Sequence, residues 1–189
     1  WIRNGNYSPI RLLASPKKNQ MIPAGIEKSF GNKQQSKLLV EGALSNRDLN
    51  TFSGIDSQDD VGFGFRSIYK WSQPKHTFAD TTDTLQQETF RSKNRLNTML
   101  AYEYTGQHFT QIERFREVEF TRNWNVTNLN TLADQHIAGG DVGIDRKGFG
   151  QINLGGDMFL IGSSYSGYKA RLATNIKTQK NLTAQINAS

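Results

Sequence analysis

The feature that most constrains this chain is the alternation of apolar and polar residues along most of its length. The stretch VGFGFRSIYKW (61–71) shows it clearly, because its odd positions are mainly apolar or aromatic and its even positions mainly small or polar. Successive side chains of a β-strand point to opposite faces, so a period of two places the apolar residues together. Similar alternation occurs in 37–46, in 95–104 and through most of 138–189. The pattern predicts an all-β fold that requires no helix.

We expect these strands to form an antiparallel meander of long strands, as part of a β-barrel or of a large open sheet. Residues 1–36 lack the alternation and hold three of the four prolines, which predicts an irregular lead-in with one short strand at most. The antiparallel sheet is expected over 37–189. Because the chain begins at Trp1 and the alternation still runs at its last residues, we expect a fragment of a larger chain.

The segment RFREVEFTRNWNV (114–126) is predicted to be one of the strands of this sheet. Its even positions place Phe120 and Trp124 on the apolar face, where Arg122 interrupts the row. A charged residue at that place argues against a lipid-facing surface unless it lies at an interface.

The stretch AGGDVGIDRKGFGQINLGGDMF (138–159) contains Gly-Gly-Asp twice and predicts a β-hairpin. Asp145 and Gly148 occupy the first and fourth positions of the connecting turn, which favours a type I turn. A left-handed Gly148 would then complete a three-residue loop with a glycine bulge. Asp145 and Gly148 are therefore predicted to be structural turn residues.

This turn also fixes a register, and a one-residue slip would move every side chain to the opposite face. It places Val142 opposite Ile152, and it sets the first glycines of the two triplets, Gly139 and Gly155, against each other. The apolar residues of both strands then share one face. The neighbouring strands extend the scheme with these pairs: Leu160 with Tyr168, Ile176 with Leu182, Phe120 with Val142, and Trp124 with Ala138.

Glycine-rich stretches can also bind calcium or phosphate, but the spacings here do not match. The calcium-binding nonapeptide needs Gly-Gly-x-Gly-x-Asp in tandem, whereas GGDVGID (139–145) has one residue too many. A Walker loop needs Gly-Lys followed by Ser or Thr, which is absent, and GFGFRS (62–67) lacks the third glycine of a dinucleotide loop. The glycines favour strand and turn geometry instead.

Other candidate site residues are few. Asp56, Asp59 and Asp60 lie in one predicted loop and are weak candidates for a metal site, since hard cations take clustered oxygens; a solvated acidic turn is the stronger interpretation. The histidines are far apart, and the absence of cysteine excludes disulfides and thiol catalysis. No cofactor and no enzyme signature is found. Aromatic residues at strand ends are predicted to form a binding surface or an interface: Trp71, Tyr102, Tyr104 and Trp124.

The net charge is +6, and the basic residues are mixed with acidic ones along the chain rather than gathered in a basic stripe. Nucleic acid is therefore not an expected partner, while anionic lipid head groups suit the charge. No stretch approaches the roughly 18 apolar residues of a membrane helix.

Two segments carry a resemblance to a known group of proteins. EGALSNRDLNTFSGIDSQDDVGFGF (41–65) and ERFREVEFTRNWNV (113–126) resemble segments of large, strand-rich outer-membrane or envelope proteins of the Bacteroidetes group, which are largely uncharacterised and several-fold longer. The positions that carry the resemblance are Ser45, Asn46, Asp48, Asn50, Phe52 and Ser53, followed by Glu113 to Asn125.

The resemblance and the strand pattern lead to two hypotheses. The first is a non-catalytic β-structure of the bacterial outer membrane or cell envelope, which serves transport, secretion or surface scaffolding. Membrane lipid or other envelope proteins are its expected partners, and an exposed edge strand could pair with another chain. The alternative is a soluble β-sandwich that binds a glycan or a protein. The apolar face would meet lipid in the first case and a second sheet in the other.

Overall fold

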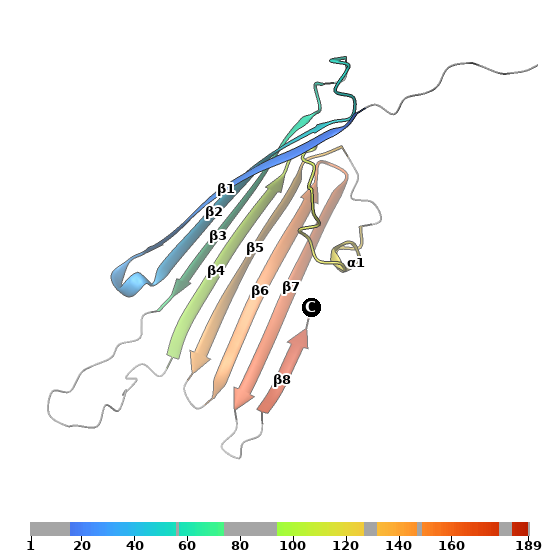
Figure 1. Cartoon of the computed structure of the whole chain (residues 1–189). Helices are drawn as coiled ribbons and strands as arrows, with labels where there is room; N and C mark the ends of the chain where they lie inside the picture. The colour runs from blue at the N-terminus through green and yellow to red at the C-terminus, as the bar shows by residue number, and fades with distance from the viewer. Residues whose placement is uncertain are drawn as a thin grey trace, which may run out of the picture.

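The chain forms an eight-stranded antiparallel sheet in the computed structural model (Figure 1). The structure describes residues 16–55, 57–73, 94–126, 132–146, 149–177 and 183–188. Each strand is hydrogen-bonded to the strands that precede and follow it in the sequence, so the order is that of a simple meander. The all-β fold and the antiparallel meander predicted from the alternation are therefore confirmed. The sheet is open, with β1 and β8 at its edges.

Seven of the eight strands are 12 or 13 residues long, and β8 has six. The strands are β1 (Lys18–Phe30), β2 (Ser36–Asp48), β3 (Val61–Ser72), β4 (Asn94–Thr105), β5 (Gln135–Arg146), β6 (Gly150–Ile161), β7 (Tyr165–Lys177) and β8 (Thr183–Ala188). A 3₁₀ turn, η1 (Asn32–Gln34), joins β1 to β2, and a one-turn helix, α1 (Phe120–Asn123), lies between β4 and β5.

The sheet begins earlier than the sequence predicted. β1 lies inside the segment expected to be irregular, and it pairs with β2 along its whole length, from Lys18 opposite Asp48 to Phe30 opposite Ser36. Pro23 is compatible with this strand because β1 is an edge, where one side of the backbone needs no ladder partner. The boundary at residue 37 was therefore wrong.

The seven strand registers place most of the large apolar residues of the sheet on one side, here termed the apolar face. The prediction of a shared apolar face is thus confirmed for the strands. The opposite side, termed the polar face, carries mainly small, polar and charged residues. The large residues of the apolar face are Ile22, Ile26, Phe30, Leu38, Val40, Leu44, Phe63, Phe65, Tyr69, Trp71, Leu96, Leu100, Tyr102, Tyr104, Val142, Ile144, Ile152, Leu154, Met158, Leu160, Tyr168, Leu172 and Ile176.

β5 and β6 form the predicted hairpin, but with a register displaced by two residues. Val142 faces Leu154, not Ile152, and Ile152 faces Ile144, so the predicted pair is wrong. The displacement continues along the sheet, where Leu160 faces Ser166 and Ile176 faces Ala184. A shift of two residues preserves the face of every side chain, which is why the faces were predicted correctly while the pairs were not.

The displacement arises because the turn lies one residue further along the chain than predicted. The last pair is Arg146 with Gly150, and Asp145 lies within β5 opposite Gln151 instead of starting a turn. Gly150 has a φ of 121°, which favours glycine at this place. Gly148 lies outside the described residues, so its positive φ stays a prediction.

The segment predicted as the strand 114–126 is not a strand. β4 pairs directly with β5, and the connection between them folds back over the polar face. Residues 106–126 of this connection are termed the strap. The sequence pattern was ambiguous here, because Phe120 and Trp124 share a face in a strand and also lie four residues apart, as on one side of a helical turn. The predicted pairs of Phe120 and Trp124 with β5 are therefore wrong.

The buried core of the described chain is small and lies on the polar face. Phe120 and Trp124 of the strap pack against Phe159 and Ile161 of β6, and all four are buried. The ring centroids of Phe120 and Trp124 lie 5.2 and 5.3 Å from that of Phe159, at steep angles that suit aromatic packing. The strap and α1 are seen over one end of strands β5 to β7 in Figure 1.

Candidate functional site

The apolar face is open to solvent even at its centre. Leu100, Leu154 and Tyr168 are 53%, 62% and 73% exposed, although they lie on strands that have neighbours on both sides. Monomeric soluble proteins rarely expose contiguous apolar surfaces of more than a few hundred square ångströms. Exposed apolar faces of this kind are typical of surfaces that contact another protein or a membrane.

The apolar rows have a regular length. They run from Phe63 to Trp71 in β3, from Leu96 to Tyr104 in β4 and from Ile152 to Leu160 in β6, nine residues in each case. A strand that crosses a membrane at a tilt of about 45° needs about 9 to 11 residues. The rows are therefore long enough for the hydrocarbon layer.

Aromatic side chains gather near the ends of these rows. At one end, the ring centroids of Phe63 and Tyr104 are 6.2 Å apart and those of Phe65 and Tyr102 are 6.4 Å apart. At the other end, Phe30 stacks on Tyr69 at 6.3 Å. Val40 and Ser67 lie between these two aromatic groups, while Leu100 pairs directly with Tyr69 and Val142 lies two strands from Trp71 in the same row. Aromatic girdles on both sides of an aliphatic band are typical of lipid-facing β-structure.

Three of the four predicted aromatic site residues lie on this face. Tyr102 and Tyr104 lie at one end of it and Trp71 at the other. Tyr102 also forms a hydrogen bond with Nδ1 of His136, with 2.9 Å between the Tyr102 oxygen and that nitrogen. Trp124 does not join them, because it belongs to the strap and is buried on the polar face.

One phenol of this group has a shifted pKa. Partial burial, together with the negative charge of Asp134, raises the pKa of Tyr104 above its ordinary value of 10.0. Both causes disfavour the phenolate. Tyr104 is therefore a neutral hydroxyl at neutral pH, as suits an aromatic residue at the boundary of an apolar layer.

The two Gly-Gly-Asp triplets lie on facing strands and complement each other. Gly139 faces Asp157, and Asp141 faces Gly155. On the polar face each carboxylate occupies the space above the facing glycine, so a Cβ at either glycine would overlap it. The prediction that the first glycines face each other is wrong, and each glycine instead makes room for an aspartate.

Arg171 of β7 bridges the two carboxylates of these triplets. Its Nη2 lies 3.0 Å from Oδ1 of Asp141, and its Nη1 donates to Oδ2 of Asp157. Charge-assisted hydrogen bonds of this type are the stronger ones in proteins. The repeated triplet thus joins three strands through one guanidinium, and sequence spacing alone gave no sign of Arg171.

Glycines of β3 allow the strap to lie against the polar face. A Cβ at Gly62 would overlap the backbone of His108 and Phe109, and one at Gly64 would lie 3.1 Å from the Phe109 ring. The stretch GFGF therefore points its glycines at the strap and its phenylalanines at the apolar face. Two alternating glycines in a strand are a signal for close backbone approach that the sequence already contained.

Arg116 holds the middle of the strap. Its Nη1 donates to Oε1 of Gln135 at 2.6 Å, and its Nη2 lies 3.0 Å from Oε1 of Glu103. Its guanidinium carbon also lies 4.5 Å from the centre of the Phe120 ring, a cation–π distance. The Arg116 and Glu103 side chains are only 11% and 22% exposed, so this ion pair is largely removed from water.

The far end of the strap is held by aromatic contacts and one lysine. The hydroxyl of Tyr165 donates to the backbone oxygen of Trp124, and Nζ of Lys169 lies 4.0 Å from the centre of a Trp124 ring. Burial lowers the pKa of Lys169, an effect that the charge of Glu117 opposes. The strap therefore contacts strands from β2 to β7.

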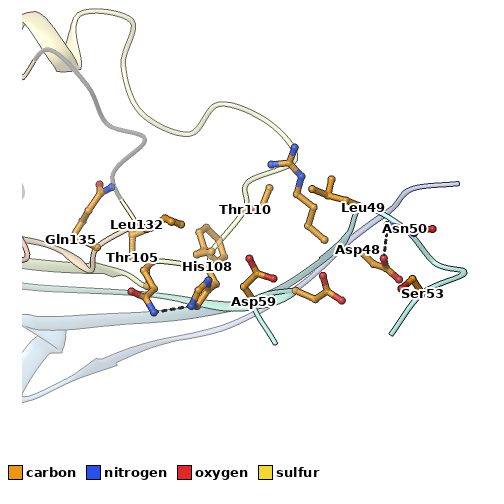
Figure 2. A pocket seen from close by; sticks show the side chains of 16 residues that line it. Asp48, Leu49, Asn50, Ser53, Asp59, Thr105, His108, Thr110, Leu132 and Gln135 are labelled. Carbon is orange, nitrogen blue, oxygen red and sulfur yellow. Dashed lines mark hydrogen bonds between the residues drawn. The ribbon is translucent and has the colours of Figure 1, made fainter. Parts of the chain in front are cut away.

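Cavities of the described residues lie beside the strap. One of about 470 Å³ lies at the end of the sheet, between residues 47–60 and the beginning of the strap (Figure 2). Polar groups on its wall bind one another: Oδ1 of Asp48 accepts from the Asn50 amide at 2.8 Å, and Gln107 and His108 are joined at 2.7 Å. A second cavity of about 390 Å³ separates the strap from β1 to β4.

Two of the three weak metal candidates line the first cavity. These are Asp59 and Asp60, whereas Asp56 lies outside the described residues. Within the part of the chain that the structure describes, no group of three or more His, Cys, Asp or Glu side chains is placed to hold a metal ion. The proximity of Asp59 and Asp60 alone does not define a cation site.

In the described ranges of the chain, no helix has the length and apolar character needed to cross a membrane. Comparison of the chain with protein-family models, with curated proteins and with solved structures gave no match. The geometry therefore defines the class of molecule by itself: an open, amphipathic antiparallel sheet with an internal strap on its polar side.

Proposed function

We propose that this chain is a non-catalytic β-structure of the bacterial outer membrane, in which the apolar face meets lipid and the polar face borders an aqueous space. The observation that carries the proposal is the exposed apolar face that continues across the strands of the sheet. Its nine-residue rows and its aromatic ends match the dimensions of a lipid layer. Transport, secretion or surface scaffolding are the roles that such a structure serves.

The polar face supports the same proposal. Charges are paired on this face, within the sheet between Arg171 and Asp141 and between Arg116 of the strap and Glu103. Arg122 no longer opposes a lipid-facing surface, because it belongs to α1 and lies 2.9 Å from Glu119. Of the charged residues on the apolar face, Lys28 lies near the end of its row, where a long cationic side chain reaches the interface.

The resemblance of 41–65 and 113–126 to Bacteroidetes envelope proteins gives the cellular location in this proposal. The second of these segments makes up most of the strap, so part of the resemblance lies in the residues that cover the polar face. The open edges of β1 and β8 pair with strands of another envelope protein in this proposal, since free edges template such pairing. A soluble sandwich needs a second sheet, whereas the eight described strands lie in one.

Tryptophan fluorescence tests the orientation of the two faces. Trp71 lies on the apolar face and Trp124 on the polar face, so single-tryptophan chains separate them: W1F/W124F retains Trp71, and W1F/W71F retains Trp124. Vesicles whose acyl chains carry bromine should quench Trp71 strongly and Trp124 weakly. Equal quenching of the two tryptophans would contradict the proposal. So would a monomer that melts cooperatively without detergent and whose Trp71 fluorescence is not quenched by the vesicles.

A further inference from the structure

We propose that the strap is a gate, which lies closed over one end of the polar face and detaches as one unit while the sheet remains intact. The inference rests on the proposed function, because it takes the polar face as the border of an aqueous space. The strap belongs to the connection between β4 and β5, which are adjacent strands that a short hairpin could have joined.

The strap is attached without taking part in the β-ladder. Beyond the Gly106 amide, which donates to the Phe63 carbonyl of β3 at 2.9 Å, its backbone–backbone bonds are local, such as Phe109 to Gly106 at 3.0 Å and Asn123 to Glu119 at 2.7 Å. The Thr110 amide donates to the hydroxyl of Ser45 rather than to a strand backbone. β4 and β5 pair from Thr105 opposite Gln135 onward, independently of the strap. Detachment therefore breaks no strand pairing.

A single charged side chain latches the middle of the strap. Arg116 meets Glu103 and Gln135 in a largely buried setting, yet its Nε is buried without a hydrogen-bond partner in the described chain. Removing one partner of a buried ion pair leaves the other charge uncompensated, which makes such a pair a sensitive point. The attachment of the strap through Arg116 is therefore strong while Glu103 and Gln135 are both present, and weak when either partner or Arg116 itself is replaced.

The closed strap covers part of the polar face and narrows the aqueous space that borders this face. Beneath it lie Ser45, which is only 1% exposed, and the cavity of about 390 Å³. Three apolar residues of the strap, Ile112, Phe115 and Val118, are more than half exposed, and Phe115 lines this cavity. Apolar constrictions in aqueous passages gate by excluding water.

Thiol labelling tests the gate directly, because the chain contains no cysteine. In the detergent-solubilised full chain, the thiol of the variant S45C should react with a maleimide only when the strap is open. Adding R116Q should raise the labelling rate by about a hundredfold. The matched control is R122Q, which removes an arginine of the strap that is 76% exposed and should leave the rate nearly unchanged.

Hydrogen exchange on the same variants shows whether the strap opens as a unit. In R116Q the amides of Thr110, Asn123 and Trp124 should accelerate together, while those paired between β4 and β5 keep their wild-type rates. An unchanged labelling rate in R116Q, or an equal acceleration of strap and sheet amides, would overturn the gate. Quenching of Trp71 by brominated lipid tests the proposed function separately, because this quenching does not depend on the position of the strap.

Discussion

The two faces of the sheet differ in a way that hydrophobicity alone does not explain. The apolar face holds most of the large apolar residues of the strands and leaves many of them exposed, whereas the polar face holds few and buries Phe159 and Ile161 completely. The difference is the strap, which gives one face a partner within the chain. A strand pattern can thus create an apolar surface that the described part of the chain leaves uncovered, while a small apolar patch on the other face becomes the core.

The largest expected effect separates the two faces by their burial. Phe159→Ala should lower the free energy of unfolding by about 3–5 kcal/mol, because it leaves a cavity among Phe120, Trp124 and Ile161. Leu154→Ala should cost far less, since Leu154 is largely exposed and its truncation leaves no closed cavity. Urea unfolding followed by circular dichroism measures both, and similar losses would abolish the distinction between the faces.

A charge placed on each face tests which of them meets lipid. Leu154→Arg should weaken vesicle insertion by about 2–4 kcal/mol, the cost of an arginine near the middle of a lipid-facing strand. Gln151→Arg, on the polar face of the same strand, should change insertion little. Flotation of the two variants with vesicles measures the difference, and equal insertion would mean that the apolar face does not contact the acyl chains.

The Gly-Gly-Asp pair offers a comparison within a single triplet. Gly155→Ala should destabilise the sheet by about 1–3 kcal/mol, because the new methyl displaces the Asp141 carboxylate from Arg171. Gly156→Ala adds its methyl to the apolar face, where the nearest atom is the Lys169 backbone oxygen at 3.5 Å, and should be neutral or slightly stabilising. Thermal unfolding of both variants tests the predicted difference in sign.

The smallest expected effect concerns Lys169 beneath the strap. Because burial lowers its pKa in the folded chain, the unfolded chain binds more protons in the alkaline range below 10.5, so this group makes stability rise with pH there. Lys169→Met should remove that rise. Urea unfolding of wild type and variant across this range measures it, and parallel pH profiles for the two chains would show that Lys169 titrates normally.

The fold class could be predicted because one local rule decides it. In β3 the alternation from Phe63 to Trp71 assigns each side chain to a face whatever the partner strand is. The same rule survived the two-residue error at Val142, since an even displacement keeps every residue on its face. Pairing itself depends on the turn, where Asp145 continues β5 instead of ending it.

The strap could not be predicted in the same way. Phe120 and Trp124 fit a strand and a helical turn equally well, and the choice was made by Phe159, a residue more than thirty positions later in the chain. Gly62 and Gly64 carried a usable signal, because alternating glycines on one face permit another backbone to approach closely. Arg116 gave no such signal, because an arginine among other charged residues is typical of a solvated surface.

The sequence by itself determined that this is an all-β chain with one apolar face, because side-chain direction in a strand follows from local backbone geometry. Only the tertiary structure decided which aspartate lies over which glycine, where the buried core forms, and that residues 106–126 cover the polar face. These depend on contacts between distant segments, in which the gain from burying Phe120 and Trp124 exceeds any local preference of the strap for a strand.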